Sequence, residues 1–309
     1  MPYASIDLNG EDALKLVRFG AYGGEKPGLI DEDGYLRDIS HLITNLSGAT
    51  LSADMLDMIR KLEVEMLPKI EGSVRYGACI GAVRNFIGVS RNYASTPEDK
   101  IANEEMKNEA AKTSSAPSLP DPILFNKAPS CIVGAHDPVM LPKGSSKIDW
   151  GVELAVIMGR RGAHIRADQA YDYIAGYCIC NDLTDRVEQY EGTGQLVKAK
   201  SAPTFGPLGP WLVTTDEILD PHALSMWVEL NGKRVQTGTT AGMLHRVPEL
   251  ISYVSRFMAL EPGDVITTGS PFGSGHEMEP PAYLKKGDRL KLGIDGLGAQ
   301  EQKILAWID

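Results

Sequence analysis

The chain has 309 residues, 43% of them hydrophobic and 23% charged, which is typical of a globular protein with one or two domains. Its net charge of −10 argues against a nucleic-acid partner, because neutralising phosphates requires clustered Lys and Arg. No apolar run approaches the roughly 18 residues of a membrane span, and the N-terminus lacks signal-peptide features. These features predict a cytoplasmic protein with no membrane partner.

Residues 1–75 are predicted to form a small N-terminal α+β domain. Short strand candidates separated by Gly-rich or Asp-Gly turns lie within residues 16–22, 27–30 and 34–38. Residues 52–69 have apolar side chains at helical spacing, and Ser52 is the expected N-cap. The methionines of this stripe, Met55, Met58 and Met66, are predicted to pack in the core.

Residues 76–309 are predicted to form a β-rich domain with peripheral helices. Strand candidates lie at 123–125, 154–158, 177–180, 211–214, 225–230, 265–268, 289–294 and 303–307. Asn231-Gly232 is a hairpin signal between two strands. Helical periodicity returns at residues 247–260. The fold class predicted for the whole chain is therefore a mixed, β-rich α+β protein.

The most unusual local signal is a polar segment at residues 96–112. Thr96 is a plausible N-cap and Pro97 suits the first helical position, but the residues that follow include almost no large apolar side chain. Such a helix has little to bury and is marginal alone. The pattern suits either a lid over an active site or a solvated surface insertion.

Two acidic residues sit at the ends of apolar strand candidates. Glu153 precedes the apolar run 154–158, and Asp182 follows the run 177–180. A carboxylate that enters a buried strand is costly unless a cation or a hydrogen-bond donor meets it. The alternative is that Glu153 lies at a strand edge and reaches water. Together, the two carboxylates are candidates to share one cation.

Polar residues that could bind an anion follow Asp182 closely. Arg186 suits contact with a carboxylate of a substrate or of a neighbouring Asp, and Gln189 lies three residues later. Lys200 lies in a Pro/Gly-rich loop and is a candidate to hold an anionic substrate. The Gly-rich loop 269–275 lacks the P-loop pattern, and no Gly-x-Ser-x-Gly elbow is present.

Taken in order, these segments resemble the fumarylacetoacetate hydrolase family, in the small bacterial branch that includes 2,4-diketo-3-deoxy-sugar-acid hydrolases and ureidoglycolate lyase-like proteins. The resemblance runs from about residue 86 to residue 307. The segments that carry it are 88–94, 123–127, 149–154, 176–186, 200–213, 262–271 and 280–288.

The resemblance implies a β-roll catalytic domain over residues 76–309 and a homodimer. It also implies that Mg²⁺ or Mn²⁺ is held by a Glu-x-Glu pair and a later Asp, and that a His-x-x-Glu pair on a lid activates water. The expected chemistry is cleavage of a C–C bond in a dicarbonyl or α-keto acid. Hard oxygen ligands suit such a cation, which stabilises negative charge on the substrate.

Carried over residue by residue, the resemblance assigns Glu153 and Asp182 as metal ligands. The catalytic positions are Lys200, Arg186, Gln189 and Asp99, and the substrate-binding positions are Arg91, Tyr93, Lys127 and Ser270.

Two motifs depart from the family pattern. Gly151 replaces the first Glu of the Glu-x-Glu pair. Thr96 and Asp99 stand where the lid has His and Glu, and Glu98 or Glu104 is a candidate substitute. Loss of a general base costs typically about 10²–10⁴-fold in rate. Hydrolysis is therefore affected more than decarboxylation or tautomerisation, neither of which needs an activated water.

The leading hypothesis is a metal-assisted hydrolase, lyase or isomerase acting on a small diketo or α-keto acid such as an acylpyruvate. A second hypothesis is a metal-free tautomerase, dehydratase or cyclase in which Gly151 makes room for a bulkier ligand. A third is a non-catalytic protein that binds a keto acid or a partner protein.

Overall fold

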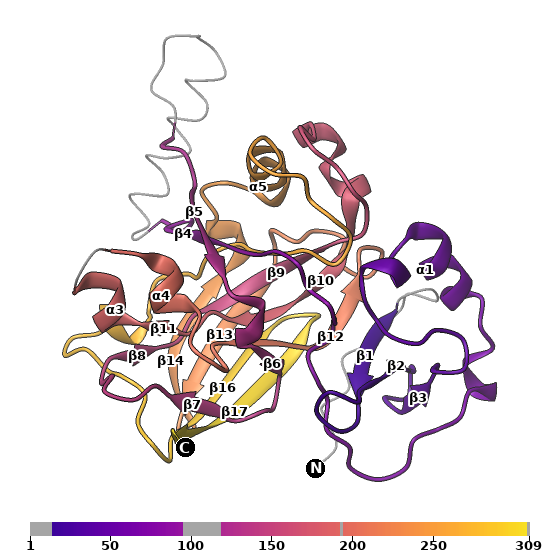
Figure 1. Cartoon of the computed structure of the whole chain (residues 1–309), viewed down its shortest axis with the longest axis horizontal. Coiled ribbons are helices and arrows are strands. Elements are labelled where there is room, and N and C mark those ends of the chain that lie inside the picture. The colour runs from indigo at the N-terminus through magenta and orange to yellow at the C-terminus, as the bar shows by residue number, and fades with distance from the viewer. Residues whose placement is uncertain (1–13, 95–118, 192–193, 308–309) are drawn as a thin grey trace.

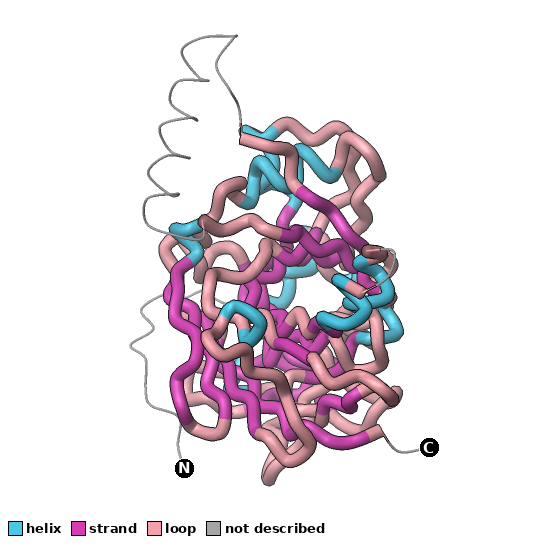
Figure 2. The backbone as a smooth tube through the Cα atoms, turned by 90° about the vertical axis from the view of Figure 1, so that its left-hand side faces the viewer, coloured by secondary structure: helices cyan, strands magenta, loops and turns pink. Residues whose placement is uncertain are grey.

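A computed structural model of the chain describes residues 14–94, 119–191 and 194–307 (Figure 1). The predicted lid segment 96–112, with Thr96 and the candidate catalytic residue Asp99, lies outside these residues. A large sheet and a smaller one form the body of the molecule, and the helices lie at its periphery (Figure 2). This arrangement confirms the predicted β-rich α+β fold.

The large sheet has ten strands, and the order of these strands determines which residues lie together at their ends. Along the sheet they are β3 (Leu36–Asp38), β2 (Lys26–Ile30), β1 (Lys15–Phe19), β12 (Gly206–Thr214), β10 (Ile174–Asn181), β9 (Val152–Met158), β15 (Val265–Thr267), β4 (Phe86–Ser90) and β5 (Ile123–Lys127), with β6 (Ile132–Gly134) pairing with β12. β9 and β10 are buried along their whole lengths. Their continuous apolar runs therefore mark the centre of the core.

The remaining elements cover the large sheet or extend it. The five-stranded sheet comprises β14 (Lys233–Thr239), β13 (Ser225–Leu230), β16 (Arg289–Ile294), β17 (Gly298–Ala306) and β7 (Val139–Leu141), and a small pair comprises β11 (Thr184–Asp185) and β8 (Ile148–Asp149). The α-helices are α1 (Ala53–Arg60), α3 (Arg186–Tyr190), α4 (Leu196–Lys200) and α5 (Val247–Val254). Short 3₁₀ helices lie at Gly48–Thr50, Val64–Met66, Pro129–Cys131, Ala167–Tyr173, Thr240–Gly242 and Gly275–Glu277.

The hairpin signal at Asn231-Gly232 is confirmed. These residues connect β13 to β14, and their φ angles are +53° and +80°. Positive φ at both central residues is the conformation that a tight two-residue hairpin requires, and Asn-Gly adopts it readily. Local turn chemistry thus determines this part of the smaller sheet.

The N-terminal strands extend the large sheet. β1 pairs with β12, so that Lys15 lies opposite Val213, and Figure 1 shows β1–β3 and α1 at one side of the body. The division into domains at residues 75 and 76 stays a prediction. α1 begins after Ser52, whose hydroxyl accepts the Met55 N–H, as expected.

The predicted methionine stripe is wrong in part. The helix ends at Arg60, and Met58 and Met66 are 40% and 78% exposed. Leu56 and Ile59 occupy the buried face instead. Periodicity over the longer window overestimated the helix, because the chain leaves helical geometry before Met66.

Helix α5 is also shorter than predicted, since it ends at Val254 and leaves Phe257 60% exposed. Its N-terminus is held by a buried histidine. The Nε2 atom of His222 accepts the Val247 N–H at 3.1 Å, so the ring acts as a neutral acceptor. Burial lowers the pKa of His222, and the nearby Arg246 lowers it further.

We expect this contact to make stability depend on pH. Because the pKa of His222 is lower in the folded protein than its ordinary value of 6.5, the His222 contribution to stability is complete above about pH 6.5 and declines below it. Thermal unfolding of wild type and His222→Gln from pH 5 to pH 8 tests this. The glutamine oxygen can still accept the N–H but does not titrate, so a wild-type profile no steeper than that of the variant would refute the expectation.

Among the described residues, no helix is both long and apolar enough to cross a membrane.

Candidate active site

The candidate site lies at one end of the large sheet, where three neighbouring strands end and a fourth begins. β4 and β15 run parallel, β9 runs antiparallel to β15, and β10 runs antiparallel to β9. The C-terminal ends of β4, β15 and β10 and the N-terminal end of β9 therefore lie together. A cavity of about 560 Å³ opens there. Its lining includes eight of the predicted site residues, namely Arg91, Tyr93, Glu153, Asp182, Arg186, Gln189, Lys200 and Ser270.

Glu153 lies inside β9 and is only 4% exposed, so the alternative of a strand-edge side chain in water is wrong. Its Oε2 atom accepts the Gly269 N–H at 2.9 Å. Burial, together with the negative charge of Asp182, raises the pKa of Glu153 to about 8. Without a further cation this carboxyl group is therefore largely protonated at neutral pH.

Asp182 follows β10 and is paired with two lysines. Its Oδ1 atom contacts the Lys127 Nζ at 2.7 Å, and its Oδ2 atom contacts the Lys200 Nζ. Burial alone would raise the pKa of Asp182, but the two ammonium groups outweigh this and lower it to about 2. Lys127 is completely buried, whereas Lys200 also lines the cavity. Asp182 is thus a permanent anion that holds two cations at the base of the site.

The family resemblance implies three carboxylate ligands, a Glu-x-Glu pair and a later Asp. Because position 151 is a glycine, this site has only two of them, Glu153 and Asp182. No three His, Cys, Asp or Glu side chains among the described residues gather closely enough to hold a metal ion. Two carboxylates nevertheless fit Mg²⁺ or Mn²⁺, because such ions are often held by one or two, with water and substrate supplying the other ligands. Each Asp182 oxygen accepts one lysine contact and retains a lone pair. Glu153 and Asp182 therefore suit a weakly held dication.

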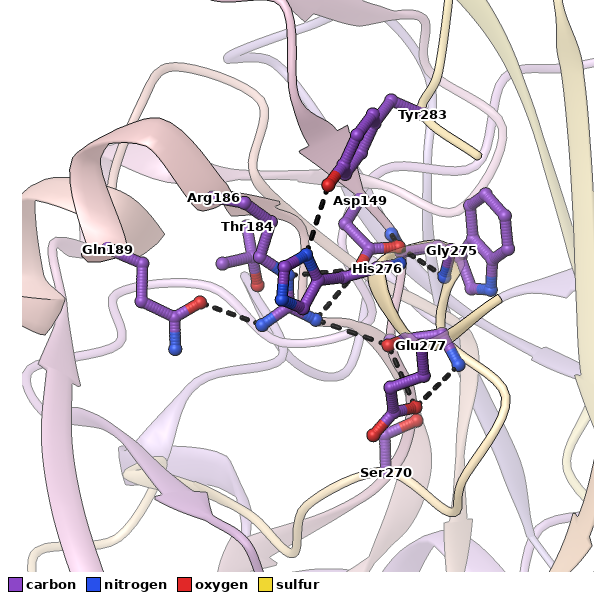
Figure 3. Close-up of polar contacts among 12 residues, drawn as sticks. Asp149, Thr184, Arg186, Gln189, Ser270, Gly275, His276, Glu277 and Tyr283 are labelled. Atoms are coloured by element: carbon purple, nitrogen blue, oxygen red, sulfur yellow. Dashed lines mark hydrogen bonds and ion pairs between the residues drawn. The ribbon is translucent and has the colours of Figure 1, made fainter. Parts of the chain in front are cut away.

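Arg186 lines the cavity, but its guanidinium group is engaged with the protein. Its Nε and Nη2 atoms contact the Asp149 Oδ2 at 2.9 and 2.7 Å, its Nη1 donates to the Gln189 Oε1 at 2.7 Å, and its Nη2 reaches the Ser274 Oγ at 3.4 Å (Figure 3). Each guanidinium nitrogen thus has a protein partner. Its predicted role in holding a substrate carboxylate stays a prediction, and the contacts favour orientation of Gln189.

Asp149 is a completely buried residue that was not predicted. Its Oδ1 atom accepts the N–H groups of Trp150 and Gly275, and its Oδ2 atom accepts the His276 N–H (Figure 3). The Gly-rich loop therefore presents its amides to carboxylates of the protein itself, Glu153 included. The sequence signals for Asp149 are its position before β9 and its place at the start of segment 149–154, one of the segments that carry the family resemblance.

Helix α3 places two side chains at the cavity. Asp185 caps it by accepting the N–H groups of Val187 and Glu188, and Gln189 and Tyr190 lie within one turn of Arg186, on the same side. Because the Gln189 oxygen accepts from Arg186, its amide nitrogen remains as a donor for a ligand. Tyr190 stacks on His276 with ring centroids 5.1 Å apart. Sequence reasoning missed Tyr190, since aromatic stacking leaves no local pattern.

The remaining predicted substrate-binding residues differ in their surroundings. Tyr93 is buried, and burial with the nearby Glu153 raises its pKa. Ser270 accepts a hydrogen bond from Gln236 at 3.1 Å. Lys127 does not line the cavity and acts through Asp182. Trp150 does line it, and in the described part of the chain its buried indole N–H has no hydrogen-bond partner.

The fold and the cavity together place the protein in a class. Its members are β-roll enzymes, which have carboxylates in a cavity at the ends of their strands. The chain belongs to the fumarylacetoacetate hydrolase family, because the family model described as fumarylacetoacetate (FAA) hydrolase C-terminal matches residues 85–305. The chain is therefore an enzyme of this family, as the resemblance predicted.

Similar proteins extend over nearly the whole chain. A "Putative hydrolase" of Burkholderia multivorans is 45% identical over 290 residues, which are 94% of this chain and 98% of that protein. The fumarylacetoacetate hydrolase of Exiguobacterium antarcticum superposes with a TM-score of 0.79 at 33% identity and covers 95% of this chain and 100% of its own.

Two further solved structures have the same fold. A "probable 2-hydroxyhepta-2,4-diene-1,7-dioate isomerase" from Mycobacterium abscessus has a TM-score of 0.78 at 30% identity, covering 96% and 99% of the two chains. Maleylpyruvate hydrolase from Sphingobium sp. SYK-6, in complex with manganese(II) and pyruvate, has a TM-score of 0.76 at 24% identity, covering 95% and 100%.

Proposed function

We propose that the protein catalyses metal-assisted cleavage of a C–C bond, or isomerisation, in a small diketo or α-keto acid such as an acylpyruvate. The observation that carries the proposal is the buried pair Glu153 and Asp182 in the same cavity as the Lys200 ammonium group. Hydrolases and isomerases among the structural neighbours, one of them bound to manganese and pyruvate, support it. A cytoplasmic location and a homodimer remain parts of the proposal.

In this mechanism Glu153 and Asp182 would hold Mg²⁺ or Mn²⁺. The bound ion would supply positive charge that stabilises the enolate of a cleaved dicarbonyl substrate. Lys200 lies at the same point of the cavity and attracts the substrate carboxylate, while the Gln189 amide donates a hydrogen bond to substrate or to the attacking water. We also propose that Asp99, which is not among the described residues, assists water activation.

Charge balance supports a substrate with negative charge. Lys127 and Lys200 carry two positive charges, and Asp182 and an ionised Glu153 carry two negative ones. A bound dication would leave the cluster with a net charge of about +2. An anionic keto acid or its enolate offsets that charge, so ion and substrate bind more strongly together than separately.

Pyruvate release from acylpyruvates and decarboxylation of oxaloacetate, each measured with and without Mg²⁺ or Mn²⁺, test the proposal. We expect turnover that is lost on chelation and restored by the ion. Turnover that persists in EDTA and in Glu153→Ala would refute it, and binding without turnover would indicate a non-catalytic protein.

A metal-free tautomerase is the second candidate, and one observation favours it. The pKa of Glu153 is raised to about 8, so this buried acid can give and accept a proton near neutral pH without any metal. Ketonisation of enol-pyruvate by chelated wild-type protein, lost in Glu153→Gln, would select this candidate.

Gly151→Glu should strengthen metal binding. A Cβ atom at position 151 would lie 3.1 Å from the Asp182 carbonyl oxygen and 3.7 Å from its Cβ, so the new side chain starts beside the acidic pair at the cost of a small backbone shift. We expect Mn²⁺ affinity by calorimetry to rise about 10- to 100-fold, since affinity follows the number of charged ligands.

Gly151→Gln is the matched control for this substitution, because it adds the same bulk without the charge. If Gly151→Glu bound Mn²⁺ no better than Gly151→Gln, the ion would not lie between Glu153 and Asp182.

A further inference from the structure

We propose that Phe272 and Tyr190 form an apolar subsite of the cavity, which binds a planar apolar group, such as a phenyl ring, at the acyl end of the substrate. This inference rests on the proposed function and adds to it the kind of group that the keto acid carries. It follows from the exposure of the two rings, from the way the protein fixes each of them, and from their place beside the acidic pair.

Two large aromatic side chains at the cavity are only half covered by the protein. Phe272 and Tyr190 both line the cavity, and each is 53% exposed. The other aromatic residues of the lining that the structure describes, Tyr93, Phe125 and Trp150, are buried. A single exposed aromatic residue is ordinary, but two at one cavity leave apolar area that a ligand can remove from water.

The loop that carries Phe272 is held on both sides of this residue. Gln236 of β14 is buried, and its amide nitrogen donates to the Pro271 carbonyl oxygen. The Gly273 N–H donates to the Glu277 Oε2 at 2.9 Å. Phe272 therefore cannot withdraw from water by a shift of the loop unless these hydrogen bonds break. The exposure of its ring is a fixed feature of the cavity wall.

Tyr190 is held by a ring from the same loop. It stacks on His276, with ring centroids 5.1 Å apart and an angle of 28° between the planes. The His276 Nδ1 contacts the Tyr283 Oη at 3.0 Å, and the His276 N–H donates to the Asp149 Oδ2 at 3.0 Å (Figure 3). The stack fixes the Tyr190 ring while leaving half of its surface exposed. Two rings that are already fixed lose little entropy when a ligand binds them.

The subsite adjoins the acidic pair. The loop of Phe272 begins at Gly269, whose N–H donates to Glu153, and the helix α3 that ends at Tyr190 closely follows Asp182. The cavity, about 560 Å³, has room for a keto acid together with a phenyl ring. An apolar acyl group beside these rings would be removed from water and would gain ring–ring contacts.

Binding of stable keto acids tests the subsite without turnover. We would titrate the protein by calorimetry, with Mg²⁺ and after chelation, using 2-oxobutanoate against 2-oxo-4-phenylbutanoate and 2-oxopentanoate against 2-oxo-5-phenylpentanoate. Each pair shares the keto acid and differs by a phenyl ring, so the ratio of affinities measures the subsite alone. We expect wild type to bind at least one phenyl compound about 10- to 100-fold more tightly than its partner, the gain typical of burying an aromatic ring.

Four variants make the result specific. Phe272→Ala and Tyr190→Ala should each reduce the ratio about fivefold, and both should fold because the side chains are half-exposed. Tyr190→Phe retains the ring and should restore the ratio. Phe257→Ala is the matched control, because it removes a phenylalanine that is 60% exposed and does not line the cavity.

Failure of wild type to bind any phenyl compound, equal affinities within both pairs, or an unchanged ratio in both alanine variants would overturn the assignment. A changed sedimentation coefficient with an unchanged ratio would also overturn it, and would place the rings at a contact between subunits. Failure of the proposed function is distinguishable: a phenyl preference that depends on Phe272, in a protein that cleaves no dicarbonyl acid, would support the subsite and refute only the reaction.

Discussion

Lys127→Met lowers the free energy of unfolding by about 3–5 kcal/mol, the cost of leaving one member of a buried ion pair without its partner. Lys127 and Asp182 are almost completely buried, with side-chain exposures of 0% and 1%. After the substitution Lys200 alone must compensate the buried Asp182 carboxylate. The thermal unfolding midpoint should fall by roughly 10 °C, as measured by calorimetry.

Lys198→Met is the matched control for Lys127→Met. Lys198 forms an ion pair with Glu188 at 2.6 Å, but the two side chains are 52% and 42% exposed. An exposed pair contributes about 0–1 kcal/mol, so this variant should unfold almost as wild type does. Equal effects of the two substitutions would show that the buried pair is not a principal support of the site.

The same pair predicts an acid limit to stability. Because the pKa of Asp182 is lowered from 3.8 to about 2, its contribution is complete above about pH 4 and is lost as the pH falls towards 2.

Glu153→Gln has opposite effects on stability and on function. The pKa of Glu153 is raised from 4.5 to about 8, so its contribution to stability is present below about pH 4.5 and is lost as the pH rises to 8. A neutral glutamine avoids this cost. In chelated protein at pH 8 we therefore expect Glu153→Gln to be more stable than wild type by a few kcal/mol and to unfold at a higher temperature, since one unit of pKa shift corresponds to about 1.4 kcal/mol.

The functional effect of Glu153→Gln is a loss of metal binding. Removing even an outer-shell partner costs about 10- to 100-fold in affinity, and a direct ligand should cost at least about 100-fold. Mn²⁺ titration followed by electron paramagnetic resonance measures this, with the exposed Glu188→Gln as the control. A variant that is less stable than wild type at pH 8 and still binds Mn²⁺ would contradict both halves of the prediction. A gain in stability with a loss of activity is common where a site keeps an unfavourable charge for function.

Sequence reasoning located the acidic pair because its signal is local. Glu153 and Asp182 each sit beside an apolar strand, and antiparallel pairing of β9 with β10 brings them together. The neighbours of Arg186 were harder to predict. An arginine at a strand exit can meet a substrate or a protein carboxylate, and only the fold of β8 against β11 places Asp149 within reach.

Long-range contacts explain the other differences. Lys127 was expected at the substrate but lies beneath Asp182, 55 residues away in the chain. No periodicity or spacing encodes such a contact, because it depends on how the sheet curves. Gly151 was singled out from the sequence, but only the fold shows that a side chain at this position would start beside the Asp182 backbone.

The proposed function depends above all on Glu153 and Asp182 holding a divalent ion between them. Anomalous diffraction from crystals of the chelated protein, soaked with MnCl₂ and pyruvate, tests this most directly. We expect one strong manganese peak within bonding distance of both carboxylates, and its loss in crystals of Glu153→Gln. A cavity without a peak, or a peak that persists in the variant, would contradict the shared metal site.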